Sequence, residues 1–162
     1  MEFITNRTLE DVERWKTLRD KGWLAMTEAE KSEWLGEIAT TPSAAKGMYT
    51  HVDLNRVETA VEAIASQLRE LGYTPLISSV KTNWTYRDAF WVEDAERYIQ
   101  NVAALREASI VFPDTPEAPT VGKKLDYNLA NDIEKILEDI NRVCENIPKS
   151  WYHAGEVFMG EI

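Results

Sequence analysis

The sequence has very little of the chemistry that marks an enzyme site. Its 162 residues include one cysteine, Cys144, and two histidines, His51 and His153. A single cysteine excludes an internal disulfide, and two histidines isolated from each other lack the ligand spacing of common zinc sites. Any metal site would have to be built from carboxylates, so we expect neither a metal nor a cofactor.

Long apolar runs and a basic start are also missing. No stretch approaches the roughly 18 apolar residues of a membrane span, and residues 1–7 lack the pattern of a signal peptide. The 28 acids and 18 bases give a net charge of −10, which repels nucleic acids and anionic membranes. We therefore expect a soluble protein made in a cytoplasm, with neither nucleic acid nor membrane as a partner. Imitation of DNA by an acidic inhibitor of a host nucleic-acid enzyme is an alternative reading of this charge.

What the sequence does contain is helical periodicity. The length fits one domain, and apolar residues recur at helical spacing in about five stretches, which predicts a mainly α, irregular bundle. We expect a helical hairpin over 8–39, core helices over 53–72, 92–108 and 129–147, and an extended aromatic tail over 148–162. The intervening residues, including the proline-rich stretch 113–119, are predicted to be irregular connections.

Three of these stretches share an aspartate, a base three residues later, and apolar residues at +4, +8 and +11. The pattern begins at Asp53, Asp94 and Asp132. An acid near a helix N-terminus, a base one turn later and one buried face would produce it in any amphipathic helix. Duplication of a helical unit of about 40 residues is the alternative. Under either reading the pattern indicates packing and not chemistry.

Several motifs superficially suggest catalysis, and each has a simpler structural explanation. Cys144 lies on the apolar stripe of its helix, which favours an inert core thiol over a nucleophile paired with His153. The glycine-lysine run 122–125 is not a phosphate loop, because it lacks the earlier glycine and the final Ser or Thr of that motif. Paired acids such as Glu156 and Glu161 are expected by chance in so acidic a chain. We therefore expect a protein that is not an enzyme.

Aromatic residues gather in two places. They are Trp84, Tyr86, Phe90 and Trp91 in one segment, and Trp151, Tyr152 and Phe158 in the tail. Aromatic side chains give large, rigid contact areas that suit protein interfaces and sugar stacking. These seven residues are our candidate interface, with plugging of the bundle core and ligand stacking as the alternatives.

Six segments resemble small proteins from the tail and baseplate gene clusters of phages and prophages of Gram-positive gut bacteria. They are residues 3–12, with Lys21-Gly22-Trp23 after them, then 26–35, 53–57, 131–137 and 151–161. The resemblance covers nearly the whole chain in the same order. It implies a structural or accessory virion component and attaches no catalytic residues.

Together these observations predict a non-enzymatic structural or adaptor protein of a phage tail or baseplate, located in the virion. Its expected partners are other tail proteins, and it could also form a homo-oligomer. Binding or hydrolysis of cell-wall polymers is the alternative that the aromatic residues and abundant carboxylates leave open.

Overall fold

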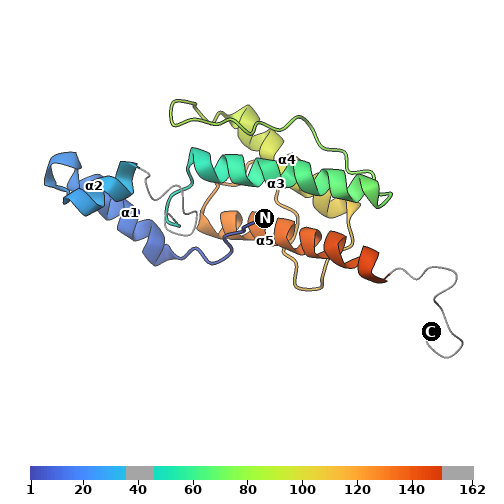
Figure 1. The fold of residues 1–162 in the computed structure, drawn as a ribbon. Helices are drawn as coiled ribbons and strands as arrows, with labels where there is room; N and C mark the ends of the chain where they lie inside the picture. Colours follow the sequence, from blue (N-terminus) through green and yellow to red (C-terminus); the bar gives the residue numbers. More distant parts are fainter. Residues whose placement is uncertain (36–45, 151–162) are drawn as a thin grey trace, which may run out of the picture.

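The protein folds into helices joined by extended connections (Figure 1). The structure is a computed structural model that describes residues 1–35 and 46–150. Its elements are α1 (Leu9–Lys21), η1 (Trp23–Ala25), α2 (Glu28–Leu35), α3 (His51–Glu70), α4 (Val92–Ala108), α5 (Tyr127–Asn146) and η4 (Pro148–Ser150). No strand occurs in the described ranges, so the predicted mainly α fold with five amphipathic helices is confirmed.

The helix boundaries differ slightly from those expected, and capping explains why. Helix α3 starts at His51 because Thr50 is its N-cap and exchanges hydrogen bonds with Asp53, which occupies the third helical position. Helix α5 starts at Tyr127 because the Asp126 side chain accepts a hydrogen bond from the Leu129 amide. Residues 148–150 form a short 3-10 helix, so the expected extended tail is wrong for these three; its remainder lies outside the described residues.

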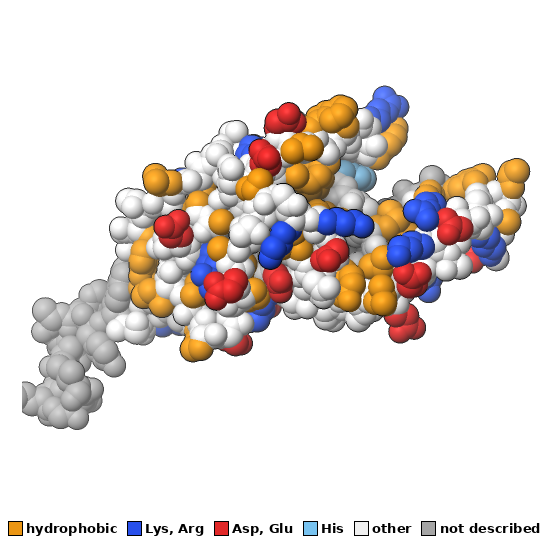
Figure 2. Space-filling model, turned by 180° about the vertical axis from the view of Figure 1, so that it is seen from behind, with side chains coloured by type: hydrophobic (Ala, Val, Ile, Leu, Met, Phe, Trp, Pro, Cys, Tyr) orange, Lys and Arg blue, Asp and Glu red, His pale blue; other side chains and the backbone are white. Residues whose placement is uncertain are grey.

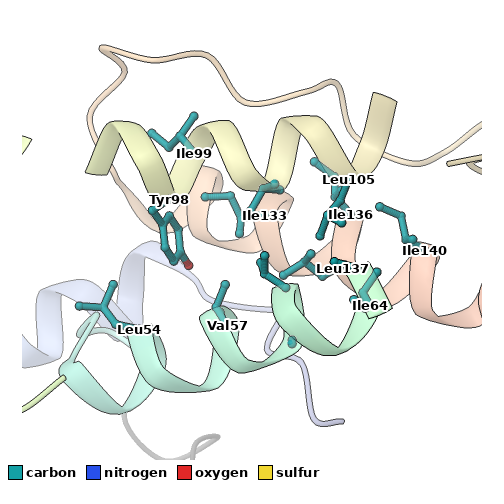
Figure 3. Close-up of a cluster of buried hydrophobic side chains, with 14 of the residues drawn as sticks. Leu54, Val57, Ile64, Tyr98, Ile99, Leu105, Ile133, Ile136, Leu137 and Ile140 are labelled. Carbon is teal, nitrogen blue, oxygen red and sulfur yellow. The ribbon is translucent and has the colours of Figure 1, made fainter. Parts of the chain in front are cut away.

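Three helices, α3, α4 and α5, pack on one another and enclose the main core. The labelled side chains in Figure 3 show that all three run in the same direction, from Leu54 to Ile64, Ile99 to Leu105, and Ile133 to Ile140. Fully enclosed members of this core are Val57, Ile64, Leu68, Val102, Leu105, Ile133, Ile136, Leu137 and Ile140. At about 1.5–3 kcal/mol for each such side chain removed from water, this cluster supplies most of the drive for folding.

Because the three helices are parallel, the chain must travel back before each one starts, and three extended segments do this. The first segment, residues 1–8, contacts α5 and α3. The second, residues 73–91, contacts α3 and α4. The third, residues 109–126, contacts α4 and α5. Each segment therefore lies between a different pair of core helices.

Side chains of α5 hold the first segment by its backbone. The Asn131 amide accepts from Arg7 N and donates to Arg7 O, both at 2.9 Å. One turn further along α5, Glu134 accepts from Ile4 N at 2.6 Å. Since Arg7 meets the earlier helix position and Ile4 the later one, the segment runs antiparallel to α5. These bonds satisfy backbone groups that would otherwise be buried without partners.

Side chains of α3 hold the second segment in the same way. The Asn55 amide accepts from Trp84 N at 2.7 Å and donates to Trp84 O at 2.9 Å. One turn later on α3, Glu58 accepts from Lys81 N at 2.7 Å. The third segment is attached differently, through the Thr115 hydroxyl, which donates to buried Asp139 at 2.8 Å.

A buried ion cluster closes the groove between α3 and α5. Arg7 donates to Glu134 at 2.7 Å and to Asp53 at 3.2 Å, and Arg56 contacts the same two carboxylates. Burial opposes the charge of Arg56, but hydrogen bonds to Glu134 and Asp53 hold its pKa above the ordinary value. Two cations facing two anions make the cluster neutral, which is the condition for burying charge without a prohibitive cost.

The α1–α2 hairpin stands apart from the bundle (Figure 1) and has its own small core. Trp15, Leu18 and Met26 are buried there, with Trp34 and Met48 packed against them. Gly47 presses against α1 so closely that a Cβ atom at this position would overlap the Asp11 carbonyl and the Trp15 ring. Among the described residues, no helix is both long and apolar enough to span a bilayer.

The repeated aspartate pattern marks the three core helices, and its packing content is confirmed. Its nine apolar positions are all buried: Val57, Val61, Ile64, Tyr98, Val102, Leu105, Ile136, Ile140 and Val143. Its bases serve different ends. Arg56 and Arg97 cross to glutamates of neighbouring helices, Glu134 and Glu58, whereas Lys135 pairs along its own helix. Whether the pattern arose by duplication stays a prediction.

Candidate interaction surface

Trp84 belongs to the core and is not available to a partner, so its place in the candidate interface is corrected. Only 3% of its surface is exposed. Its indole Nε1 donates to Glu58 at 3.0 Å, and the Lys81 ammonium lies 3.7 Å from its ring centre. The Asn55 side-chain amide is hydrogen-bonded to both the N–H and the C=O of Trp84, and these two bonds hold residue 84 against α3.

Phe90 is half-buried and also belongs largely to the core. Its ring meets Trp84 edge to face at 5.6 Å between centroids, and Tyr98 at 6.1 Å. The Tyr98 hydroxyl is bonded to that of Tyr49, and burial raises the pKa of both phenols. The aromatic cluster therefore joins the start of α3 to α4.

Tyr86 and Trp91 are exposed at 76% and 67%, as a partner surface would require. Tyr86 lies on a tight turn in which the Asp88 carboxylate accepts from the Thr85 amide and hydroxyl, at 2.7 and 2.8 Å, and Trp91 is the N-cap of α4, three residues after Asp88. These two hydrogen bonds lower the pKa of Asp88. Val92, exposed at 70%, follows directly. We call residues 85–92 the turn prong.

A second exposed apolar tip occurs at the end of the α1–α2 hairpin. Gly22 adopts a positive φ of 76° that lets the chain reverse, and Trp23 and Leu24 follow it. Leu24 is almost fully exposed, and Trp23 is 45% exposed under the ammonium of Lys31. We call residues 22–26 the hairpin prong. The sequence predicts this turn but not its exposed tip, because helical periodicity does not report what a turn presents to solvent.

The two prongs project from the same end of the bundle, where α3 begins, and the surface between them is hollowed (Figure 2). A hollow of about 310 Å³ lies at the foot of the turn prong. Its wall includes Met48, Tyr49, His51, Tyr86 and Phe90. We call the two prongs and this hollow the two-pronged end.

The remaining candidate residues and motifs offer no rival site in the described part of the chain. Trp151, Tyr152 and Phe158 lie outside the described residues. Cys144 is buried on α5, and burial raises the pKa of its thiol, as a core cysteine would show. Among residues 1–35 and 46–150, no three His, Cys, Asp or Glu side chains gather as metal ligands would.

Comparison with known proteins adds no relative. No protein-family model, curated protein or solved structure matches this chain. The two-pronged end must therefore be interpreted from its own geometry.

Proposed function

We propose that this chain is a non-enzymatic structural or adaptor protein of a phage tail or baseplate and docks another tail protein through its two-pronged end. The observation that carries the proposal is the exposure of Leu24, Tyr86 and Trp91 on two projections that point the same way. Exposed aromatic and aliphatic side chains concentrated at one place mark protein interfaces.

The attachment of the turn prong supports a docking role. Residues just before it are fixed to α3 through Asn55 and Glu58, and Arg97 of α4 clamps the same Glu58 at 2.5 and 2.9 Å. A prong whose preceding residues are fixed by hydrogen bonds that are buried or partly buried loses little freedom when a partner binds. The exposed rings of Tyr86 and Trp91 can then act as rigid anchors.

The resemblance to tail-cluster proteins gives the kind of partner. Tail assemblies are built from repeated copies of several proteins, so an adaptor needs a specific apolar contact and no catalytic group. The proposal accordingly places the protein in the virion.

The test is incorporation into particles after induction of a lysogen that carries the gene with Leu24→Ser and Trp91→Ser. We expect the chain with both changes to be depleted from purified virions by about tenfold or more, since hot-spot truncations cost at least about 2 kcal/mol each. The matched control is Leu76→Ser with Ile110→Ser, which removes exposed aliphatic side chains at the opposite end of α3 and α4. Equal depletion by both pairs, or a wild-type chain missing from purified virions, would refute the proposal.

A further inference from the structure

A second cleft, which shares only Met48 and Tyr49 with the hollow of the two-pronged end, lies where the hairpin meets the start of α5. We call it the hairpin cleft. Its volume is about 310 Å³. It is walled by α1, by residues 46–49 and by residues 124–130. Its lining includes Leu9, Val12, Leu125, Lys16, Lys46 and Lys124.

The charge of the hairpin cleft is opposite to that of the protein. Three lysines and Arg7 line it against one acid, Asp126, although the chain as a whole carries −10. Lys16 is paired with Glu13 at 2.7 Å. Lys46 and Lys124 form no ion pair with any residue in the described ranges. An occupant that matches this lining is acidic and apolar together.

The chain contains a segment with that composition. Residues 151–162 hold two acids, Glu156 and Glu161, on either side of Val157-Phe158-Met159, and they contain no lysine or arginine. We propose that residues 151–162 of one copy bind in the hairpin cleft of a second copy, with Glu156 and Glu161 facing Lys46 and Lys124.

The length of α5 argues for a second copy over the same chain. Its 20 residues span about 30 Å, and the hairpin cleft lies at its first turn. Phe158 is eight residues beyond Ser150, so it can reach at most roughly 29 Å from that residue. The apolar centre of the segment could therefore meet the hairpin cleft of its own chain only if the segment ran almost fully extended back along α5. In a neighbouring copy no such limit applies.

Contacts of this kind are heterologous, because the surface that binds differs from the surface that is bound. Repeating them produces a ring when the rotation closes and a filament when it does not. The inference goes beyond the proposed function, since head-to-tail association of the purified protein needs no partner at the two-pronged end. The two proposals therefore fail independently.

Sedimentation velocity of the purified full chain over a range of concentrations tests the proposal. We expect concentration-dependent association that weakens by about tenfold or more in Lys46→Glu with Lys124→Glu, because like charges would then face each other. The control, Arg19→Glu with Lys123→Glu, makes the same charge change at exposed positions outside the hairpin cleft and should associate like the wild type.

A charge exchange then identifies the contacting segment. Glu156→Lys with Glu161→Lys should weaken association to the same extent, and all four changes in one chain should restore it. A mixture of the two double variants should associate in alternation beyond a dimer, because each segment then meets a cleft of opposite charge on the other variant. A monomeric wild type overturns the proposal, as does association that survives the cleft changes. Failure of the fourfold variant to associate, with helical content intact by circular dichroism, overturns the assigned pairing.

Discussion

The first and second extended segments are held by the same backbone device and differ in the side chain at its centre. Two stretches of seven residues are identical at two threonines, an asparagine and an aspartate. They are Thr5-Asn6-Arg7-Thr8-Leu9-Glu10-Asp11 and Thr82-Asn83-Trp84-Thr85-Tyr86-Arg87-Asp88. Each has its third residue bonded through N and O to an asparagine, with a glutamate one turn further along the helix. This third residue is Arg7 in the first and Trp84 in the second.

That difference decides what surrounds each segment. Arg7 brings a charge between the helices, where the buried carboxylates of Asp53 and Glu134 pair with it and with a second arginine, Arg56, which is 13% exposed. Trp84 places an apolar ring and one N–H donor beside Glu58. The Glu58 carboxylate is balanced by a single arginine, Arg97, whose side chain is 18% exposed. The same backbone geometry thus accommodates a charged cluster on one side of α3 and an aromatic cluster on the other.

The largest expected effect separates the two glutamates. Glu134→Gln leaves Arg7 and Arg56 with only Asp53 as a buried counter-charge, and breaking a buried pair costs about 3–5 kcal/mol. Glu58→Gln should cost less, about 1–3 kcal/mol, because Arg97 can turn toward water. Urea unfolding of both variants measures the difference. Equal losses of the free energy of unfolding would show that the identity of Arg7 or Trp84 does not determine how strongly the neighbouring glutamate stabilises the fold.

A smaller and equal effect is expected at the two asparagines. Asn131→Ala and Asn55→Ala each leave one N–H and one C=O of a segment without a partner, at a cost of about 1–3 kcal/mol. Hydrogen exchange should quicken at the Arg7 amide in the first variant and at the Trp84 amide in the second. Asn141→Ala, which removes only an exposed bond to Glu145, is the control. Exchange that quickens at both segments in either variant would contradict independent attachment.

The side chains that hold the two segments could not be predicted from the sequence, although the helices could. Periodicity located the three core helices because their apolar stripes are long, and it placed their ends within two residues. It could not find Asn55, Glu58, Asn131 and Glu134, since polar residues beside an apolar stripe look the same whether they face water or a returning segment. The two matched seven-residue stretches were a usable signal for the two segments, because identity at four of their seven positions is more than helical periodicity requires.

Likewise, the sequence did not show which aromatic residues of the candidate interface are exposed. Tyr86 and Trp91 are exposed and Trp84 is buried, although all three are aromatic residues within eight positions. The composition of a segment indicates how much aromatic contact area it has, but not which rings are buried. Trp84 is buried because its backbone is bonded to Asn55. Leu24 was missed because nothing in its neighbourhood distinguishes an exposed leucine from a packed one.

The smallest expected effect compares the aspartates that end the two matched segments. The Thr8 side chain is the largest cause of the lowered pKa of Asp11, whereas for Asp88 the Thr85 backbone amide comes first and the hydroxyl second. Thr8→Ala should therefore remove the largest cause of the lowered pKa of Asp11, whereas Thr85→Ala should leave the largest cause in place for Asp88, since alanine keeps the amide. NMR titration of the carboxyl carbons measures both.

The pH dependence of stability should follow the same order. A carboxyl whose pKa is lower in the folded state stabilises the protein above its unfolded pKa of about 3.9, and that contribution is lost as the pH falls through the folded value. The free energy of unfolding should therefore fall less steeply below about pH 4 in Thr8→Ala than in Thr85→Ala. A larger effect of Thr85→Ala would contradict this account. It would mean that the two aspartates are held by bonds other than those that Thr8 makes to Asp11 and Thr85 makes to Asp88.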